Sequence, residues 1–183
     1  MNYPNGLIKK NNNNINYGNR GMNLEEDINI TNQYYLDMDI AVIYKKPTPI
    51  TINHVDYPNR IDAVITNAKF KIPSTTDYNG IYKGKYIDFE AKETANKTSF
   101  PLANIHKHQI EHLRKITKHG GIGFIIVRFS SLNRIFLLDG LELFNFIDNN
   151  TRKSIPLEYF ISHGKEIKLS LRPRIDYLKY INI

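Results

Sequence analysis

Short clusters of apolar residues, separated by polar turns, run the length of this chain, and their spacing predicts the secondary structure. An apolar stripe at helical spacing follows Asn23, a residue type that caps helices, and predicts a helix ending near Leu36. A second stripe predicts a helix over residues 104–118. Two shorter helices are expected over residues 141–147 and 155–161, the latter starting at Ser154.

Continuous apolar runs predict the strands. The most apolar run, Ile122–Phe129, is expected to be a buried central strand, with Arg134–Leu138 as its neighbour. Ile40–Tyr44 predicts a short strand, which two following prolines end. The basic tail from Lys165 to Lys179 fits either an edge strand with a basic outer face or a phosphate contact. This order of elements predicts a mixed central sheet flanked by helices, an α/β or mixed α+β domain.

The stretch from Ser74 to Glu93 has the pattern of a hairpin. Lys83 and Gly84 predict its turn, because Gly supplies the positive φ that two-residue loops require. A loop of two residues places Asp77 directly opposite Glu90. Residues paired in this way share a face of the sheet, with Cβ atoms roughly 5 Å apart.

The same register adds a hydroxyl and an ammonium group to the two carboxylates. Thr75 falls opposite Lys92, which shares a strand face with Glu90. This set fits a divalent-metal nuclease, since Mg²⁺ takes oxygen ligands, activates a bound water and benefits from a nearby cation. The alternative is an exposed hairpin with ordinary surface charges, and a shift of one residue in the register would turn Asp77 to the opposite face.

Composition and charge narrow the choice of partner. The 183 residues carry a net charge of +7 with a pI near 9.4, which favours a polyanionic partner, most simply nucleic acid. Basicity that serves only solubility is the alternative. The absence of cysteine excludes disulfides and thiolate metal sites. No apolar stretch approaches a membrane span or a signal peptide, so a cytoplasmic location is expected.

Two segments differ in composition from the rest. Residues 1–17 are basic and rich in asparagine and are expected to form a disordered arm that, with Arg20, contacts phosphates or has no role. Residues 18–183 form the single domain, from which residues 49–72 are expected to protrude, with Arg60 at the tip. A plain solvated loop is the alternative for this segment. The lysines that flank it are also candidate DNA contacts: Lys45, Lys46, Lys69 and Lys71.

The helix over residues 104–118 contains a possible metal-binding motif. The residues from His108 to His112 match the pattern His-x-x-Glu-His of some zinc peptidases, and the two histidines share a helical face. No third ligand is evident in the sequence. A solvated or DNA-facing polar side of the helix is therefore the preferred interpretation.

Asp77 followed by Glu90-Ala91-Lys92 resembles the signature of the restriction-endonuclease-like superfamily, an Asp followed later by Asp/Glu-x-Lys. More closely, the chain resembles the RecU family of Holliday junction resolvases. The similar stretches span nearly the whole chain: Tyr3-Pro4-Asn5-Gly6, Asn19-Arg20-Gly21-Met22, Lys45-Lys46-Pro47-Thr48-Pro49, Thr75-Thr76-Asp77-Tyr78-Asn79-Gly80-Ile81-Tyr82-Lys83-Gly84, Tyr86-Ile87-Asp88-Phe89-Glu90-Ala91-Lys92-Glu93, Lys97-Thr98-Ser99-Phe100-Pro101-Leu102, His108-Gln109-Ile110-Glu111-His112 and Pro173-Arg174-Ile175-Asp176-Tyr177.

The resemblance implies a homodimeric, Mg²⁺-dependent nuclease, with Mn²⁺ as a substitute ion, that cuts four-way DNA junctions symmetrically in recombination and repair. It implies metal ligation by Asp77 and Glu90, with Thr75 and Gln109 in the same site, and transition-state stabilisation by Lys92. Gln109 enters the site through the resemblance alone.

The resemblance also makes residues 49–72 a stalk that projects into the centre of the junction, and it implies contact with the strand-exchange recombinase. Asp88 lies on the same ideal strand face as Glu90 and remains a substitute acid. Two other functions stay open. One is a DNA-binding accessory protein that does not cut, and the other is an ordinary restriction endonuclease with the same active site.

Overall fold

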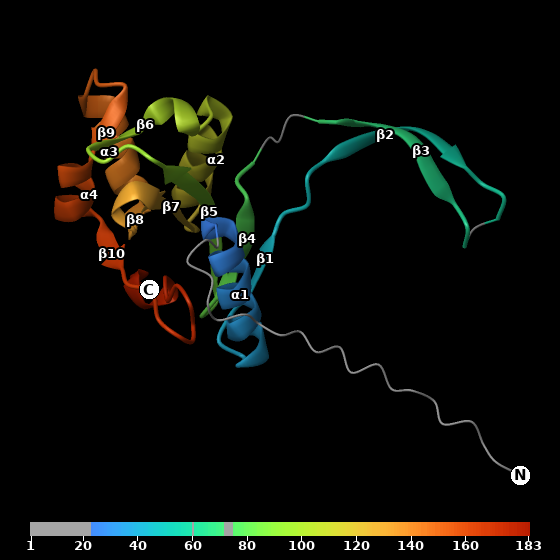
Figure 1. Ribbon diagram of the computed structural model, residues 1–183, viewed down its shortest axis with the longest axis horizontal. Coiled ribbons are helices and arrows are strands. Elements are labelled where there is room, and N and C mark those ends of the chain that lie inside the picture. Colours follow the sequence, from blue (N-terminus) through green and yellow to red (C-terminus); the bar gives the residue numbers. More distant parts are fainter. Residues whose placement is uncertain (1–22, 60, 72–74) are drawn as a thin grey trace, which may run out of the picture.

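The computed structural model describes residues 23–59, 61–71 and 75–183, and a mixed β-sheet lies at its centre (Figure 1). The expected arm over residues 1–17, together with Arg20 and Arg60, lies outside the described residues. In chain order the elements are α1 (Leu24–Asp37), β1 (Val42–Lys45), β2 (Ile50–Asp56), β3 (Val64–Phe70), β4 (Tyr78–Tyr82), β5 (Lys85–Thr94), β6 (Ser99–Pro101), the 3-10 turn η1 (Leu102–Asn104), α2 (Lys107–Lys118), β7 (Ile122–Phe129), η2 (Ser130–Leu132), β8 (Arg134–Asp139), α3 (Gly140–Asn149), β9 (Ser154–Pro156), α4 (Leu157–His163), β10 (Lys165–Ile167) and η3 (Leu178–Tyr180).

The central sheet has the strand order β1-β4-β5-β7-β8-β10. Strands β5 and β7 run parallel, whereas the other neighbouring pairs are antiparallel. Strand β5 therefore has a partner along each edge, and the strand expected at Ile122–Phe129 is central as predicted. The expected mixed α+β fold is confirmed.

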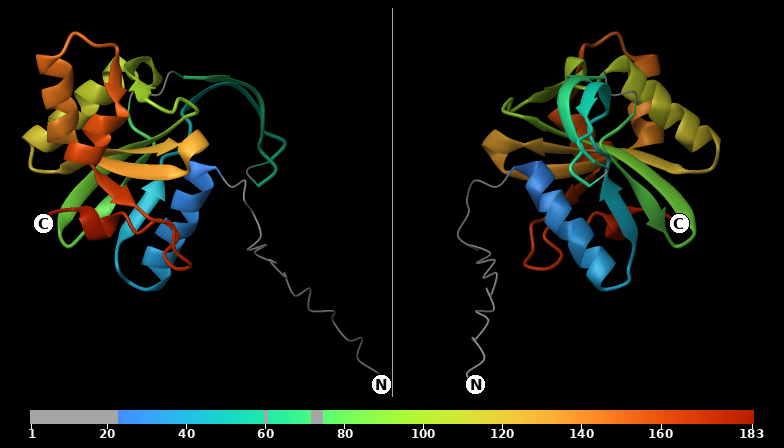
Figure 2. Two further views of the ribbon diagram at one scale, coloured as in Figure 1. Left: turned by 60° about the vertical axis from the view of Figure 1, so that its left-hand side comes forward. Right: turned by 90° about the vertical axis from the view of Figure 1, so that its right-hand side faces the viewer.

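Helices cover both faces of this sheet (Figure 2). On one face, α1 and the C-terminal tail pack over Phe89 and Phe124, and Tyr177 of the tail is completely buried there. On the other face, α2, α3 and α4 pack over a second apolar cluster that includes Ile125 and Leu138. Because side chains alternate along a strand, the face that buries Phe89 leaves Glu90 pointing toward α2.

Local sequence signals predict one helix boundary correctly and another wrongly. The predicted cap of α1 is confirmed, because the Asn23 side chain accepts a hydrogen bond of 2.8 Å from the Glu26 amide. Helix α2 begins at Lys107, since residues 102–104 form a 3-10 turn. The predicted helix start at Ser154 is wrong. Residues 154–156 pair with β6 as strand β9, so α4 begins one residue after Pro156.

The β4–β5 hairpin has the predicted register. Its turn is Lys83-Gly84, and both residues have positive φ, 47° and 74°. These values belong to the tight turns that match the twist of paired strands. Tyr82 consequently pairs with Lys85, and the ladder continues to Tyr78 opposite Phe89.

Strands β2 and β3 form the stalk hairpin, which extends away from the central sheet (Figure 1). They pair with each other and with no other described strand. Every residue of β3 is exposed, and so is every residue of β2 except the half-buried Val55. At the base, the Lys71 amide donates to the Pro49 carbonyl at 2.9 Å. The stalk hairpin thus holds its shape mainly through its own ladder.

The basic tail divides into two parts. Strand β10 is an edge strand, which agrees with one of the two expectations for this segment. Further along, Arg174 turns inward and pairs with the buried Asp27 of α1 at 2.7 Å. In the part of the chain that the structure describes, no helix has the length and apolar character needed to cross a membrane.

Candidate active site

Glu90 lies at the centre of a polar cluster between β5 and α2. Its side chain is fully buried, and the backbone amide of Asp77 donates to its Oε2 at 3.1 Å. Lys92, two residues further along β5, makes an ion pair with the same carboxylate. Lys92 Nζ also lies 4.0 Å from Asp77 Oδ2. The structure therefore brings together the three residues that the hairpin register predicts.

The surroundings of Glu90 disfavour the ionised form of its carboxyl group. Burial, together with the facing Asp77 carboxylate, raises the pKa of Glu90 to about 7, while Lys92 opposes the rise. A buried acid beside a second acid is stabilised by an added cation. The lysine alone does not restore the ordinary pKa, so the cluster has the electrostatic character of a cation-binding site.

Gln109 reaches the site from the first turn of α2. Its Nε2 donates to Glu90 Oε1 at 2.7 Å, and its Oε1 accepts from the His106 amide at 3.0 Å. Because a backbone amide can only donate, this second bond fixes which end of the Gln109 amide faces Glu90. Gln109 holds Glu90 in this geometry. Its oxygen would have to give up the bond from the His106 amide, at the start of α2, before it could become a metal ligand.

Thr75 is half-buried and lies two residues before Asp77. The β4–β5 ladder ends at Tyr78, so Thr75 lies outside the paired region. In the described structure its side chain makes no hydrogen bond to either carboxylate, and its expected place in the metal site remains a proposal.

The donor set fits a hard divalent ion. Mg²⁺ is usually held by one or two carboxylates and completes its shell with water and substrate phosphate. Asp77 and Glu90 are such a pair, and Asp77 is the more exposed of the two. Within the described ranges no three His, Asp or Glu side chains form a group able to hold a metal by themselves.

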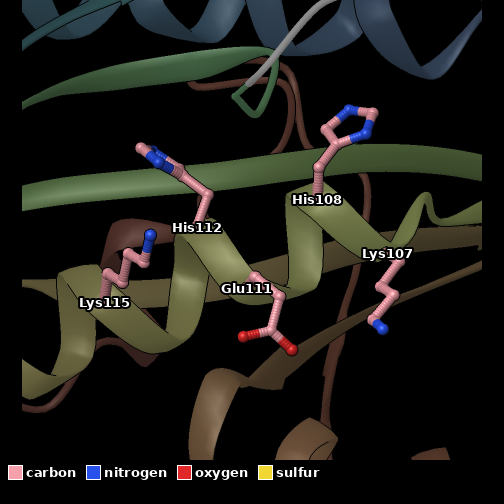
Figure 3. A pocket seen from close by; sticks show the side chains of 5 residues that line it. All are labelled: Lys107, His108, Glu111, His112 and Lys115. Atoms are coloured by element: carbon pink, nitrogen blue, oxygen red, sulfur yellow. The ribbon is translucent and has the colours of Figure 1, made fainter.

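The His-x-x-Glu-His motif of α2 lines an open hollow on the surface (Figure 3). Figure 3 shows His108 and His112 projecting from one side of the helix and Glu111 from the other. His112 Nε2 lies 3.2 Å from the buried carboxylate of Asp88. His112 therefore packs toward β5, as one partner of an acid, rather than taking part in a group of metal ligands.

The expected DNA contacts lie in different surroundings. Lys69 and Lys71 are exposed along one leg of the stalk hairpin. Lys45 is half-exposed and pairs with Glu25 of α1. Lys46 lies in the most enclosed surroundings of these lysines, because its side chain is mostly buried and its ammonium pairs with Asp88 at 2.8 Å. Its ammonium is therefore already paired within the chain, and the DNA contact expected of Lys46 stays a prediction.

Sequence reasoning missed the second polar cluster on β5. Asp88 was expected only as a substitute acid, yet it is fully buried and gathers polar side chains from four segments. We call this group the Asp88 cluster, and its members are Asp88, Lys46, Thr76, Tyr86 and His112. The signals present in the sequence were the i,i+2 spacing of Asp88 and Glu90 and the i,i+3 spacing of Gln109 and His112.

A sheet that buries an acid–acid–lysine set against a helix defines a candidate metal-dependent nuclease site, and comparison with known proteins gives its family. The model of the family described as "RecU: Recombination protein U" matches residues 19–183, and the chain belongs to this family. It is 57% identical to the Holliday junction resolvase RecU of Geobacillus sp. (strain WCH70), over 91% of this chain and 84% of that protein.

A second RecU protein agrees with this assignment. The Holliday junction resolvase RecU of Bacillus cytotoxicus is 54% identical over 91% of this chain and 85% of its own length. Among solved structures, the Archaeoglobus fulgidus Holliday junction resolvase Hjc matches with a TM-score of 0.42 and 9% identity, over 76% of this chain and 94% of Hjc.

Proposed function

We propose that this protein is a structure-selective endonuclease that resolves Holliday junctions by hydrolysing phosphodiester bonds in recombination and repair. The observation that carries the proposal is the convergence of Asp77, Glu90 and Lys92, two carboxylates and an ammonium in one partly buried site. Membership of a family whose relatives bear the name of Holliday junction resolvases supports the junction as substrate.

Mg²⁺ is the proposed ion, with Mn²⁺ as a substitute. Asp77 and Glu90 would hold it, with Thr75 and Gln109 as further candidates from the same site. When bound, the ion supplies Lewis-acid polarisation of the scissile phosphate and a lowered pKa for an attacking water. The protein's part is to hold the donors still, and Gln109 does so by fixing one oxygen of Glu90 at 2.7 Å.

Lys92 is the proposed transition-state stabiliser. Its side chain is 24% exposed, and its ammonium lies beside both carboxylates, so a phosphate can approach it. A cation placed where negative charge develops lowers the barrier without reorganising during the reaction. Lys92 also offsets the repulsion between Asp77 and Glu90 before the substrate and the ion bind.

The finer proposals concern the assembly. Symmetrical cuts require two active sites, so a homodimer is proposed, and contact with the strand-exchange recombinase is a further proposal. The stalk hairpin, with Lys69 and Lys71, is the proposed contact to the junction, and Arg20, Lys45 and Arg60 remain candidate DNA contacts. With genomic DNA as substrate, the cytoplasm is the proposed location in a bacterium.

The test is cleavage of a synthetic four-way junction in Mg²⁺, with a linear duplex of the same sequence beside it. We expect paired, symmetrical nicks in the junction by the wild type. Asp77→Ala and Lys92→Ala are expected to lower the cleavage rate by about 100-fold or more, because each removes an interaction with the reacting phosphate or its ion. Junction binding, measured in Ca²⁺, should survive both changes.

Two outcomes would overturn the proposal. Tight junction binding by the wild type without cutting in Mg²⁺ or Mn²⁺ would make the protein an accessory factor. Equal cutting of duplex and junction at a fixed sequence would make it an ordinary restriction endonuclease.

A further inference from the structure

The Asp88 carboxylate is saturated by donors from its own chain. Its Oδ2 accepts from Lys46 Nζ at 2.8 Å, from the Tyr86 hydroxyl at 2.9 Å and from His112 Nε2 at 3.2 Å. Its Oδ1 accepts from the Thr76 hydroxyl. A carboxylate offers about four acceptor positions. Asp88 therefore has little capacity left for a metal ion, and its place is structural rather than that of a substitute ligand.

Two of these donors come from the roots of the stalk hairpin. Lys46 lies four residues before β2 begins, and Thr76 lies six residues after β3 ends. The Lys46 ammonium also donates to the Thr76 hydroxyl at 2.9 Å. The chain segments that lead into and out of the stalk hairpin are thus bound to each other and to one buried acid of the central sheet.

The same roots lead directly into the candidate active site. The Lys46 amide donates to the Asp77 carbonyl at 2.7 Å, and the Asp77 amide donates in turn to Glu90. Asp77 is the residue that follows Thr76. A displacement of either root would therefore move one proposed metal ligand relative to the other.

Strand β5 and helix α2 are joined by two side-chain contacts. Glu90 is bound to Gln109, and Asp88, two residues earlier on the same strand face, is bound to His112, three residues later on α2. The Asp88 cluster therefore contacts the stalk roots, the strand that carries Glu90 and the helix that carries Gln109.

We propose that Asp88 is a positioning residue that couples the stalk hairpin to the active site by holding both stalk roots on strand β5. This inference rests on the function proposed above. A junction arm that is bound by the stalk hairpin is then held at a fixed distance from Asp77 and Glu90, so that its scissile phosphate lies in the active site. Geometry errors of about 1 Å at a reacting centre lower rates by about 100-fold.

The first experiment compares Asp88→Asn with Asp27→Asn. Asp27 is an equally buried acid with two arginine partners, Arg128 and Arg174, but it joins α1 to β7 and the tail, away from the stalk roots. Below the melting temperature of each variant, Asp88→Asn is expected to cut the junction between about 10-fold and 100-fold more slowly at saturating protein. Its junction Kd should stay within a factor of about three, and Asp27→Asn should cut at the wild-type rate.

The second experiment measures the position of the stalk hairpin directly. The chain has no cysteine, so Ile61→Cys at the stalk and Leu141→Cys on α3 give two unique spin-labelling sites, both on exposed residues. Labelled chains are diluted with excess unlabelled protein, so that only pairs within one chain are measured. We expect a narrow distance distribution in the wild type and in Asp27→Asn, and a broadened one in Asp88→Asn.

Lys46→Met separates anchoring from DNA contact, because it keeps the side-chain stem and removes the ammonium. We expect it to broaden the distance distribution as Asp88→Asn does. Weaker junction binding with an unchanged distribution would identify Lys46 as a phosphate contact and overturn the coupling.

The results also separate this inference from the proposed function. Wild-type protein that does not cut the junction refutes the function itself. Wild-type protein that cuts, together with an Asp88→Asn variant that cuts equally fast or keeps a narrow distribution, refutes only the coupling role of Asp88.

Discussion

The β4–β5 hairpin and the stalk hairpin are both antiparallel ladders, and they differ in what surrounds them. Strand β5 pairs with β4 along one edge and with β7 along the other, and its residues from Ile87 to Glu90 are buried. Strands β2 and β3 pair only with each other among the described strands, and nearly all of their residues are exposed. The proposed catalytic acids thus lie in this hairpin (Glu90) and directly before it (Asp77), where the sheet holds both of its edges.

This difference indicates a division of labour. A site that must keep two acids and a lysine within a few ångströms needs a rigid support, whereas a segment that enters a branched DNA needs exposure and reach. Segments with few buried contacts open and move at low free-energy cost. The Asp88 cluster lies where these two kinds of structure meet, and this location explains why a buried acid is found at the base of an exposed hairpin.

The largest expected effect, on the free energy of unfolding, comes from comparing the same Phe→Ala substitution made separately in each hairpin. Phe89 of β5 is fully buried and stacks between Tyr78 and Phe124, with centroid distances of 4.8 and 4.7 Å. Phe89→Ala is expected to lower the free energy of unfolding by about 3–5 kcal/mol, because it leaves a cavity in the core. Phe70 of β3 is 83% exposed, and Phe70→Ala should change the same quantity by less than about 0.5 kcal/mol.

Urea denaturation followed by circular dichroism measures both changes. Similar losses in the two variants would mean that Phe70 contributes as much to the folded state as the buried Phe89, contrary to its exposed place on the stalk hairpin.

Binding of the metal ion is expected to change the free energy of unfolding by a smaller amount, and only through the site at the β4–β5 hairpin. An ion that binds the folded chain alone, at a free concentration about 100-fold above its Kd, raises the free energy of unfolding by about 2.7 kcal/mol. Mg²⁺ should therefore raise the melting temperature of the wild type by roughly 5–10 °C. Asp77→Ala should abolish this increase.

Asp56→Ala is the matched control, since it removes an exposed carboxylate from the stalk hairpin. An equal Mg²⁺ response in Asp77→Ala and the wild type would place the ion elsewhere on the protein.

The parts of the fold that could be predicted from sequence are those that local chemistry decides. The Lys83-Gly84 turn fixes the register of the hairpin, and this register, continued one residue past its last pair, brings Asp77 next to Glu90. The cap at Asn23 likewise fixes the start of α1. In each case the deciding atoms are within a few residues of one another, so a short stretch of sequence contains the whole argument.

The parts that failed depend on contacts between distant segments. Lys46 and Asp88 are 42 residues apart, and no local pattern tells that a lysine beside two prolines turns inward to a buried acid. Ser154 resembles a helix start, but residues 154–156 pair with β6 instead. The contact of Gln109 with Glu90 depends on how α2 crosses β5, which helical spacing does not determine.

The smallest expected effect concerns the electrostatic contact of the stalk hairpin with DNA. Lys69 and Lys71 are exposed on one of its legs, and Lys85 is a similarly exposed lysine at the turn of the β4–β5 hairpin. Each lysine that neutralises a phosphate contributes about 1 to the slope of log K against log salt concentration. Lys69→Ala and Lys71→Ala should each lower the magnitude of this slope for junction binding by about 1, without changing the unfolding free energy. Lys85→Ala should leave the slope unchanged, and an equal decrease in all three variants would show that the junction contacts both hairpins alike.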